Sequence, residues 1–162
     1  MEHTRNGFSV PMSRAERDRD LKTIHVRLGS KTHDFVVRRD AAVLMERLIR
    51  RLDWLEPLTV RGGWSGTYGH RKIGSSSVWS EHAAGTALDW HAQWHPQGKR
   101  NAGWSLWKRL VLRAWLEHTP AGRAFRWGND FHTTADAMHL EVRSPAHLAK
   151  FNQYAKKKGW TS

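Results

Sequence analysis

The chain has 162 residues, carries 27 lysines and arginines against 15 aspartates and glutamates, and contains no cysteine. A chain of this length is most simply one domain with its own core, here spanning residues 1–162. The lack of cysteine excludes disulfide bonds, thiolate metal sites and cysteine nucleophiles, so a metal ion would need His, Asp or Glu ligands. The net charge of +12 indicates a polyanionic partner such as nucleic acid, an anionic wall polymer or anionic lipid.

The first half of the chain is predicted to hold a hairpin and a long helix. Residues 1–20 are polar and weakly patterned, which favours a loosely ordered or short helical lead-in. Residues 23–39 alternate apolar and polar side chains on either side of a break at "GSKTH", a pattern typical of a β-hairpin. Asp40 is then placed as an N-cap, and apolar residues recur at helical spacing until Pro57, which predicts a helix. Residues 58–64 favour a short strand, and the glycine- and serine-rich residues 65–80 favour a functional loop.

The second half mixes short strands with two further helices. The stretch "EHAAGTALDWHA" favours a turn that enters a buried strand, and Ser105 is suited to cap a helix over residues 106–118. Residues 125–144 are predicted as a loop followed by a strand, and Pro145 opens a last amphipathic helix to about Lys158. Strands and helices do not alternate regularly, so the predicted class is α+β, with a small, mainly antiparallel sheet flanked by helices.

A histidine and an aspartate stand seven positions apart in "SEHAAGTALD". The residues between His82 and Asp89 are small and include Gly85, so the backbone can turn tightly and bring both side chains to one point. A zinc site needs such convergence, because its nitrogen and oxygen ligands lie about 2.0 to 2.2 Å from the ion. The spacing alone is also compatible with two unrelated residues, so a third ligand is required.

The stretch "TADAMHLEV", residues 134–142, contains a candidate for that ligand. His139 lies in an apolar, strand-like setting, and Asp136 lies three positions upstream at the mouth of a loop. A carboxylate beside a metal ligand can act as a general base in metal-assisted hydrolysis. The structural alternative is a core histidine, with Asp136 capping a turn.

Other histidines and the tryptophans flank the loops. The ten tryptophans could line a groove for sugar or peptide, although large apolar anchors for a small core are the simpler interpretation. Four histidines next to glycine- or tryptophan-rich loops are possible substrate contacts: His70, His91, His95 and His132.

The two histidine segments together resemble a known enzyme family. Residues 80–89 are similar to the signature S-x-H-x-x-G-x-A-x-D, and residues 136–139 to [DE]-x-x-H, of the zinc D-alanyl-D-alanine carboxypeptidases. That family also contains the L-alanyl-D-glutamate endopeptidases of bacteriophage endolysins. The resemblance covers about residues 59–142, and it implies a Hedgehog/DD-peptidase-like fold.

Carried over to this chain, the resemblance implies that His82, Asp89 and His139 ligate Zn²⁺. Asp136 would be the general base and later the proton donor to the leaving amine. Aspartate rather than glutamate at this position is similar to the endolysin branch.

Three further residues take roles next to the implied zinc site. Arg71 corresponds to the family's loop arginine, which polarises the scissile carbonyl or binds a substrate carboxylate. Ser80 would be a substrate-facing hydroxyl. Glu141 alternates onto the same strand face as His139, so it would orient that ligand or serve a structural purpose.

The function implied is a zinc-dependent peptidoglycan peptidase of the endolysin type that cuts the wall stem peptide at L-Ala-D-Glu. The alternatives are a D-Ala-D-Ala carboxypeptidase of the same family, or a non-enzymatic basic module that binds nucleic acid or wall polymer. We expect bacterial peptidoglycan as partner, with anionic wall polymers also attracted by the basic charge. We also expect a monomer without a membrane span or signal peptide, made in the host cytoplasm and acting on the wall after release.

Overall fold

The computed structural model describes residues 1–58 and 65–160 and confirms the α+β class. The predicted strand at residues 58–64 lies almost wholly outside the described residues. Within them, no helix is long and apolar enough to cross a membrane. The helices are α1 (Arg14–Asp20), α2 (Ala42–Leu55), α4 (Leu106–His118) and α5 (Pro145–Lys157), and the strands are β1 (Leu21–Leu28), β2 (Lys31–Arg38), β3 (Ala87–Asp89), β4 (Phe125–Trp127) and β5 (His139–Val142).

The predicted hairpin is formed by β1 and β2, which pair antiparallel from Leu21↔Arg38 to Leu28↔Lys31. The apolar residues that alternate along β1 face the core, as their spacing predicts. The turn is shorter than the predicted break at residues 29–33, because strand pairing already resumes at Lys31.

The long helix α2 is confirmed, but the predicted N-cap is wrong. A 3-10 turn over Arg39–Ala41 precedes the helix, and Ala41 stands at the capping position. The carboxylate of Asp40 instead pairs with Arg38, 3.0 Å away. The helix is held by its buried apolar face, so its start does not depend on a side-chain cap.

The other predicted helix starts are confirmed. The side chain of Ser105 accepts a hydrogen bond from the Lys108 amide at the start of α4, and Pro145 occupies the first turn of α5. The lead-in contains the short helix α1, which begins with a capping box between Ser13 and Glu16.

A three-stranded antiparallel sheet in the order β3-β5-β4 positions the two histidine segments. Its edge strand β4 was predicted as loop. The strand has only three residues, and Phe125 and Trp127 are buried by packing that no local pattern reveals. Because β5 lies in the centre, it pairs with both short strands.

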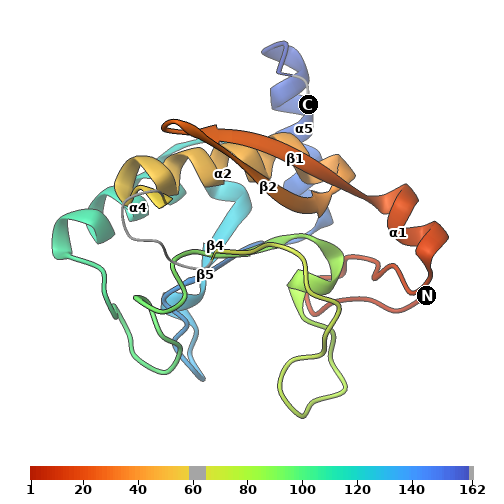
Figure 1. Ribbon diagram of the computed structural model, residues 1–162, viewed down its shortest axis with the longest axis horizontal. Coiled ribbons are helices and arrows are strands. Elements are labelled where there is room, and N and C mark those ends of the chain that lie inside the picture. The colour runs from red at the N-terminus through yellow and green to blue at the C-terminus, as the bar shows by residue number, and fades with distance from the viewer. Residues whose placement is uncertain (59–64, 161–162) are drawn as a thin grey trace.

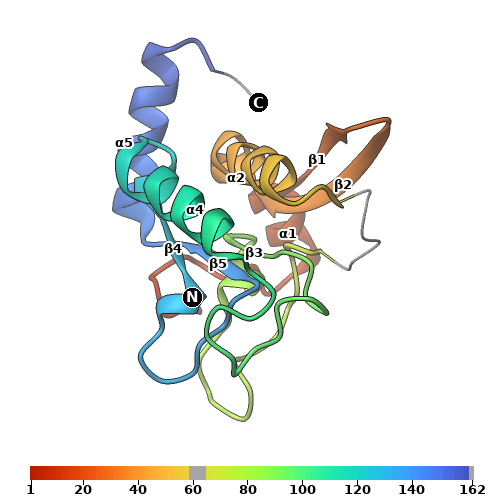
Figure 2. The same ribbon diagram turned by 90° about the vertical axis from the view of Figure 1, so that its left-hand side faces the viewer.

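The hairpin, α2 and α5 lie on one side of the molecule, and the long loops lie on the other (Figures 1 and 2). One continuous apolar core joins the hairpin, α2, α5 and the sheet. Of the tryptophans, Trp90, Trp104 and Trp127 are buried in this core, whereas Trp54 and Trp107 are exposed. The core therefore holds the sheet, whose strands β3 and β5 carry some of the candidate site residues and whose neighbouring loops and turns carry the others.

Candidate metal centre

The pairing of β3 with β5 brings the two histidine segments together. Asp89 ends β3 and His139 begins β5, and the two are direct cross-strand partners. Side chains of such partners project from the same face of a sheet, so their polar ends meet. Residues fifty positions apart in the chain thus become neighbours through three pairs of strand residues.

His82 reaches the same point from a tight 3-10 turn over Glu81–Ala84. The turn ends at Gly85, whose φ of +69° is left-handed, and whose carbonyl accepts a hydrogen bond from the Arg38 amide of β2. A Cβ at Gly85 would lie 2.6 Å from that amide nitrogen, so only glycine allows this approach. The ring of His82 is fixed by a hydrogen bond of 2.6 Å from Nδ1 to the Thr67 carbonyl, which leaves Nε2 to face Asp89 and His139.

Three donor atoms converge at the centre of the site. Nε2 of His82 lies 3.2 Å from Nδ1 of His139 and 3.2 Å from Oδ1 of Asp89, and the last two atoms are 2.9 Å apart. A tetrahedral ion with bonds of about 2.1 Å places its ligand atoms roughly 3.4 Å from one another. The two nitrogens and one oxygen therefore fit zinc in both spacing and chemistry, and the three residues form a buried cluster that could hold a metal ion.

Glu141 contacts the far side of the His139 ring. Its Oε2 accepts a hydrogen bond of 2.9 Å from Nε2 of His139, so the ring presents Nδ1 to the other two ligand candidates. The other carboxylate oxygen of Glu141 is bound by Arg126, Arg5 and Asn6. The carboxylate is therefore held by four partners and cannot swing away from the histidine.

Electrostatics favour an ionised carboxylate on each side of His139. Burial alone would raise the pKa of Asp89, but hydrogen bonds from His139 and His82 outweigh it and hold the pKa well below its usual range. In the same way, the hydrogen bond from His139 outweighs burial and lowers the pKa of Glu141 to about 2. Burial would lower the pKa of His139, yet the two carboxylates raise it to about 9. A metal ion bound at Nδ1 must therefore displace a proton.

Asp136 is buried beside the cluster and has one uncommitted oxygen. Its Oδ2 accepts a hydrogen bond of 3.1 Å from Gln97, whereas Oδ1 has no hydrogen-bond partner among the described residues. Burial, with a further contribution from the charge of Asp89, raises the pKa of Asp136. A buried, unpaired carboxylate oxygen is costly, so its presence here indicates a group that receives a proton or a polar ligand.

Gly128 makes room for this arrangement. A Cβ at this position would lie 2.7 Å from the Asp136 carbonyl oxygen and 3.2 Å from Cβ of His139. The Gly128 carbonyl accepts a hydrogen bond of 2.9 Å from the backbone amide of Asp136, and this bond fixes the loop that carries the Asp136 carboxylate. The absence of a side chain thus lets the loop lie directly against β5.

The remaining predicted site residues line a cavity of about 600 Å³ at the metal cluster. A second cavity of about 740 Å³ adjoins it, because Arg5, Phe131 and Thr133 line both; we call the two cavities lobes. Nη2 of Arg71 lies 3.8 Å from Oδ2 of Asp89, and its side chain is 59 % exposed at the rim. Ser80 also lines the cavity, but its hydroxyl accepts a hydrogen bond from the backbone amide of His82 and so caps the 3-10 turn. All seven predicted site residues line the lobe at the metal cluster: Arg71, Ser80, His82, Asp89, Asp136, His139 and Glu141.

Three of the four further histidines, His70, His91 and His95, line neither lobe. His91 and His95 are buried beside Glu56 at the end of α2, where Nε2 of His91 lies 3.3 Å from the Glu56 carbonyl oxygen and Nε2 of His95 lies 2.6 Å from its carboxylate. This contradicts the prediction of substrate contacts for both. His70 is exposed, and its ring is tilted by 44° against that of Trp79 with the ring centres 4.7 Å apart; His132 lines the neighbouring lobe.

Several residues of the site were missed by sequence reasoning. Gln97 comes from a loop, Arg126 from β4 and Asn6 from the N-terminal segment, and none of them stands in a recognisable motif. Glu81 lies inside the first motif and is buried. Its carboxylate accepts a hydrogen bond of 2.8 Å from the backbone amide of Asn6, and burial raises the pKa of Glu81. Its position directly before a ligand candidate was the one available signal.

The comparison with known protein families agrees with this geometry. Residues 73–142 match the family model of D-alanyl-D-alanine carboxypeptidases, and this stretch contains the three ligand candidates and Asp136. Arg71 lies two positions before the matched residues. No curated protein and no solved structure matches the chain. The family match together with the His-Asp-His cluster supports a metallopeptidase that acts on peptidoglycan.

Proposed function

We propose that this protein is a zinc-dependent peptidase that hydrolyses an amide bond in the stem peptide of bacterial peptidoglycan. The observation that carries the proposal is the convergence of three ligand atoms of His82, Asp89 and His139 next to the unpaired Oδ1 of Asp136. The match to the carboxypeptidase family model over the same residues supports it independently.

Several residues of the chain have separate roles in the proposed hydrolysis. His82, Asp89 and His139 would hold the zinc ion, which would act as a Lewis acid that lowers the pKa of a water molecule and polarises a carbonyl group. Oδ1 of Asp136 accepts the proton of the attacking water and returns it to the leaving amine, while Gln97 holds Oδ2 and thereby the orientation of the group. Arg71 at the rim donates to the developing oxyanion or to a substrate carboxylate.

We propose L-Ala-D-Glu as the bond that is cut. The cavity at the metal cluster shares Arg5, Phe131 and Thr133 with the second lobe, so substrate can extend beyond the reacting bond in that direction. Such an extended cavity suits an endopeptidase. The second candidate is D-Ala-D-Ala carboxypeptidase activity, which the description of the matched family favours.

The proposal is tested by zinc content and by product masses from isolated peptidoglycan. We expect one zinc per chain and new amino groups from the natural protein, and the fragment masses name the bond. Asp136→Ala should keep zinc but lose about 10²- to 10⁴-fold in rate, because it removes only the proton acceptor. His139→Ala should lose zinc as well.

The matched control is Asp34→Ala, since Asp34 is an exposed hairpin aspartate paired with His25. This variant should cleave like the natural protein. Full activity in Asp136→Ala would refute the assigned role. Absence of both zinc and cleavage, together with salt-sensitive binding to DNA, would favour the non-enzymatic basic module instead.

We further propose that the protein acts as a monomer, is made in the cytoplasm of a bacterial host and reaches the wall only after release. The net charge of +12 supports attraction to an anionic wall. Expression in a susceptible bacterium should cause turbidity loss only after the membrane is permeabilised. Turbidity loss before permeabilisation would contradict release as the controlling step, and sedimentation of a dimer would contradict the monomer.

A further inference from the structure

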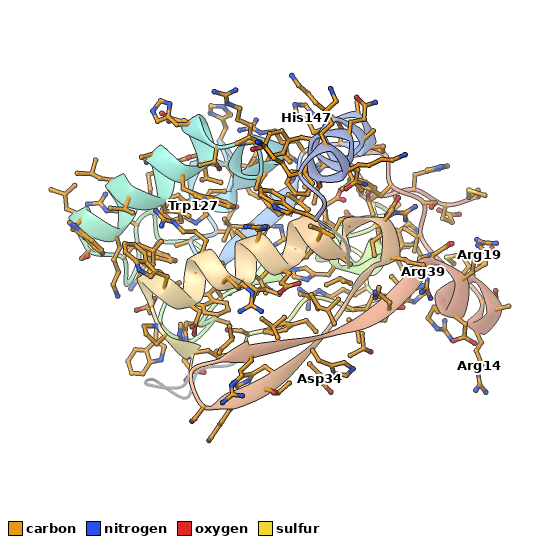
Figure 3. The ribbon with its side chains drawn as sticks, turned by 90° about the horizontal axis from the view of Figure 1, so that it is seen from above. Arg14, Arg19, Asp34, Arg39, Trp127 and His147 are labelled. Atoms are coloured by element: carbon orange, nitrogen blue, oxygen red, sulfur yellow. The ribbon has the colours of Figure 1, made fainter. Side chains whose placement is uncertain are left out.

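The second lobe of the cavity is rich in arginine. Its volume is about 740 Å³, and it adjoins the metal cluster at Arg5, Phe131 and Thr133. The guanidinium groups of Arg5 and Arg126 each lie 5.3 Å from the centre of the Phe131 ring. His147 on α5 and Trp127 at the end of β4 also line this lobe; both residues are labelled in Figure 3. We call it the arginine cleft; five arginines line it against two acidic residues, namely Arg5, Arg113, Arg123, Arg126 and Arg143 against Glu117 and Asp130.

Three of these arginines already have carboxylate partners. Arg113 forms two hydrogen bonds with Asp130, at 2.9 and 2.5 Å. Arg5 and Arg126 both bind Glu141 beside the metal cluster. Each of the three guanidinium groups thus has a carboxylate partner within the protein, although Arg5 and Arg126 share the single carboxylate of Glu141.

Arg123 and Arg143 differ from them. Nε of Arg123 donates to the Glu117 carbonyl at 2.9 Å, and Nε of Arg143 donates to the Phe125 carbonyl at 2.7 Å. Among the described residues, neither guanidinium has a carboxylate within ion-pair distance. Each is thus held in place by one nitrogen while its two Nη groups stay available. That is the arrangement that binds a planar oxyanion through two parallel hydrogen bonds.

We propose that the arginine cleft is a substrate subsite, in which Arg123 and Arg143 bind a carboxylate of the stem peptide while an adjacent amide bond lies at the metal cluster. The inference rests on the proposed function for the identity of the polymer. The adjoining position of the arginine cleft favours a carboxylate of the same peptide over a separate anionic chain, because the cleft and the cavity at the metal cluster share three lining residues. Arg123 and Arg143 then determine which part of the stem peptide reaches the reacting position.

The test measures binding separately from cleavage. The probe is a synthetic stem peptide that contains both the L-Ala-D-Glu and D-Ala-D-Ala bonds, with its carboxylates free or converted to carboxamides. Calorimetric titration uses the full chain with zinc and the Asp136→Ala change, so that bound peptide is not consumed. Adding Arg123→Gln and Arg143→Gln should weaken binding of the free-carboxylate peptide about ten- to hundred-fold.

Two comparisons isolate the guanidinium groups. Arg14→Gln with Arg27→Gln removes the same charge from exposed positions of α1 and β1 and should leave binding unchanged. Arg123→Lys with Arg143→Lys keeps the charge but loses the paired donors, so it should recover only part of the affinity. Converting the carboxylates to carboxamides should weaken binding to the natural arginines and have little further effect in the glutamine variant.

The outcomes separate this inference from the proposed function. Loss of peptide binding in the glutamine variant supports the subsite even if no preparation cleaves peptidoglycan. Equal binding of both peptides by all variants refutes it even if the enzyme is active. Binding of glycerol phosphate polymer, but not of the peptide, through Arg123 and Arg143 would also refute it and would assign the cleft to a wall phosphate.

Discussion

The buried carboxylate of Glu56 can be used to test how much its ion pairs stabilise the loop of residues 91–104. Glu56 follows α2 directly, and its side chain is 2 % exposed. Its two oxygens lie 2.6 Å from Nε2 of His95 and 3.0 Å from Nζ of Lys108. These contacts tie α2 to α4 and to the loop of residues 91–104, which also carries Gln97.

The magnitude follows from the pKa of Glu56. Burial would raise this pKa, but hydrogen bonds from His95 and Lys108 outweigh it and lower the pKa from 4.5 to about 2. Because the folded pKa is depressed, the stabilisation is fully present above pH 4.5 and is lost as the pH falls towards 2. Each pKa unit corresponds to about 1.4 kcal/mol, so the contribution at neutral pH is about 3 kcal/mol.

The assay is urea unfolding of the natural protein and Glu56→Gln from pH 7 to pH 2. The difference in free energy of unfolding should be about 3 kcal/mol at pH 7 and should shrink towards zero at the acid end. Other carboxylates and any metal loss affect both proteins alike, so the difference isolates Glu56. A matched control is Glu46→Gln, which removes only an exposed pair with Arg50 on the same helix and should cost about 0.5 kcal/mol or less.

The reasoning on Glu56 fails under either of two results. A difference below about 1 kcal/mol at pH 7 would mean that burial and ion pairing cancel, as they do for many buried pairs. A large difference that persists unchanged to pH 2 would mean that glutamine damages packing rather than charge pairing.

Three further predictions concern the metal centre. Gly128→Ala places a Cβ 2.7 Å from the Asp136 carbonyl oxygen, so it should lower turnover at least about tenfold with zinc still bound; unchanged turnover would show that the loop yields freely. Glu141→Gln should weaken zinc binding about 10- to 100-fold in chelator competition, because a neutral amide no longer supports the His139 ring as a charged partner; unaltered affinity would make Glu141 structural only. Gly85→Ala should lower the free energy of unfolding by about 1 to 3 kcal/mol in urea, and a variant as stable as the natural protein would contradict the strain at φ +69°.

Elements with strong local periodicity could be predicted from the sequence. The apolar face of α2 and the alternation along β1 are long enough to reveal their secondary structure without tertiary contacts. The start of α2 was less accessible, because Asp40 is a good capping residue by type but pairs with Arg38 instead. Strand β4 was missed because three residues give no period.

The same contrast holds for the candidate site. His82, Asp89 and His139 could be singled out because their two segments resemble the motifs of a known enzyme family, whereas the small residues and the apolar strand around them left a structural role open. The structure brings all three together. His91 and His95 were misjudged, since the tryptophan-rich loop resembled a binding loop. Both contact Glu56, more than thirty residues earlier, His91 through its backbone carbonyl and His95 through its carboxylate, and no local pattern links a histidine to so distant a residue.

The N-terminal segment shows why the motifs alone cannot form this site. Glu81 and Glu141 flank the ligand candidates, and both are buried, so each needs donors to offset the cost of losing water. Asn6 donates a hydrogen bond to each carboxylate. Its backbone amide lies 2.8 Å from Oε1 of Glu81, and its side-chain Nδ2 lies 3.1 Å from Oε1 of Glu141. Arg5 adds a charged partner to Glu141 and at the same time borders the arginine cleft. A segment without any motif therefore fixes the carboxylate that orients His139, and it links the metal cluster to the surface on which we place the substrate.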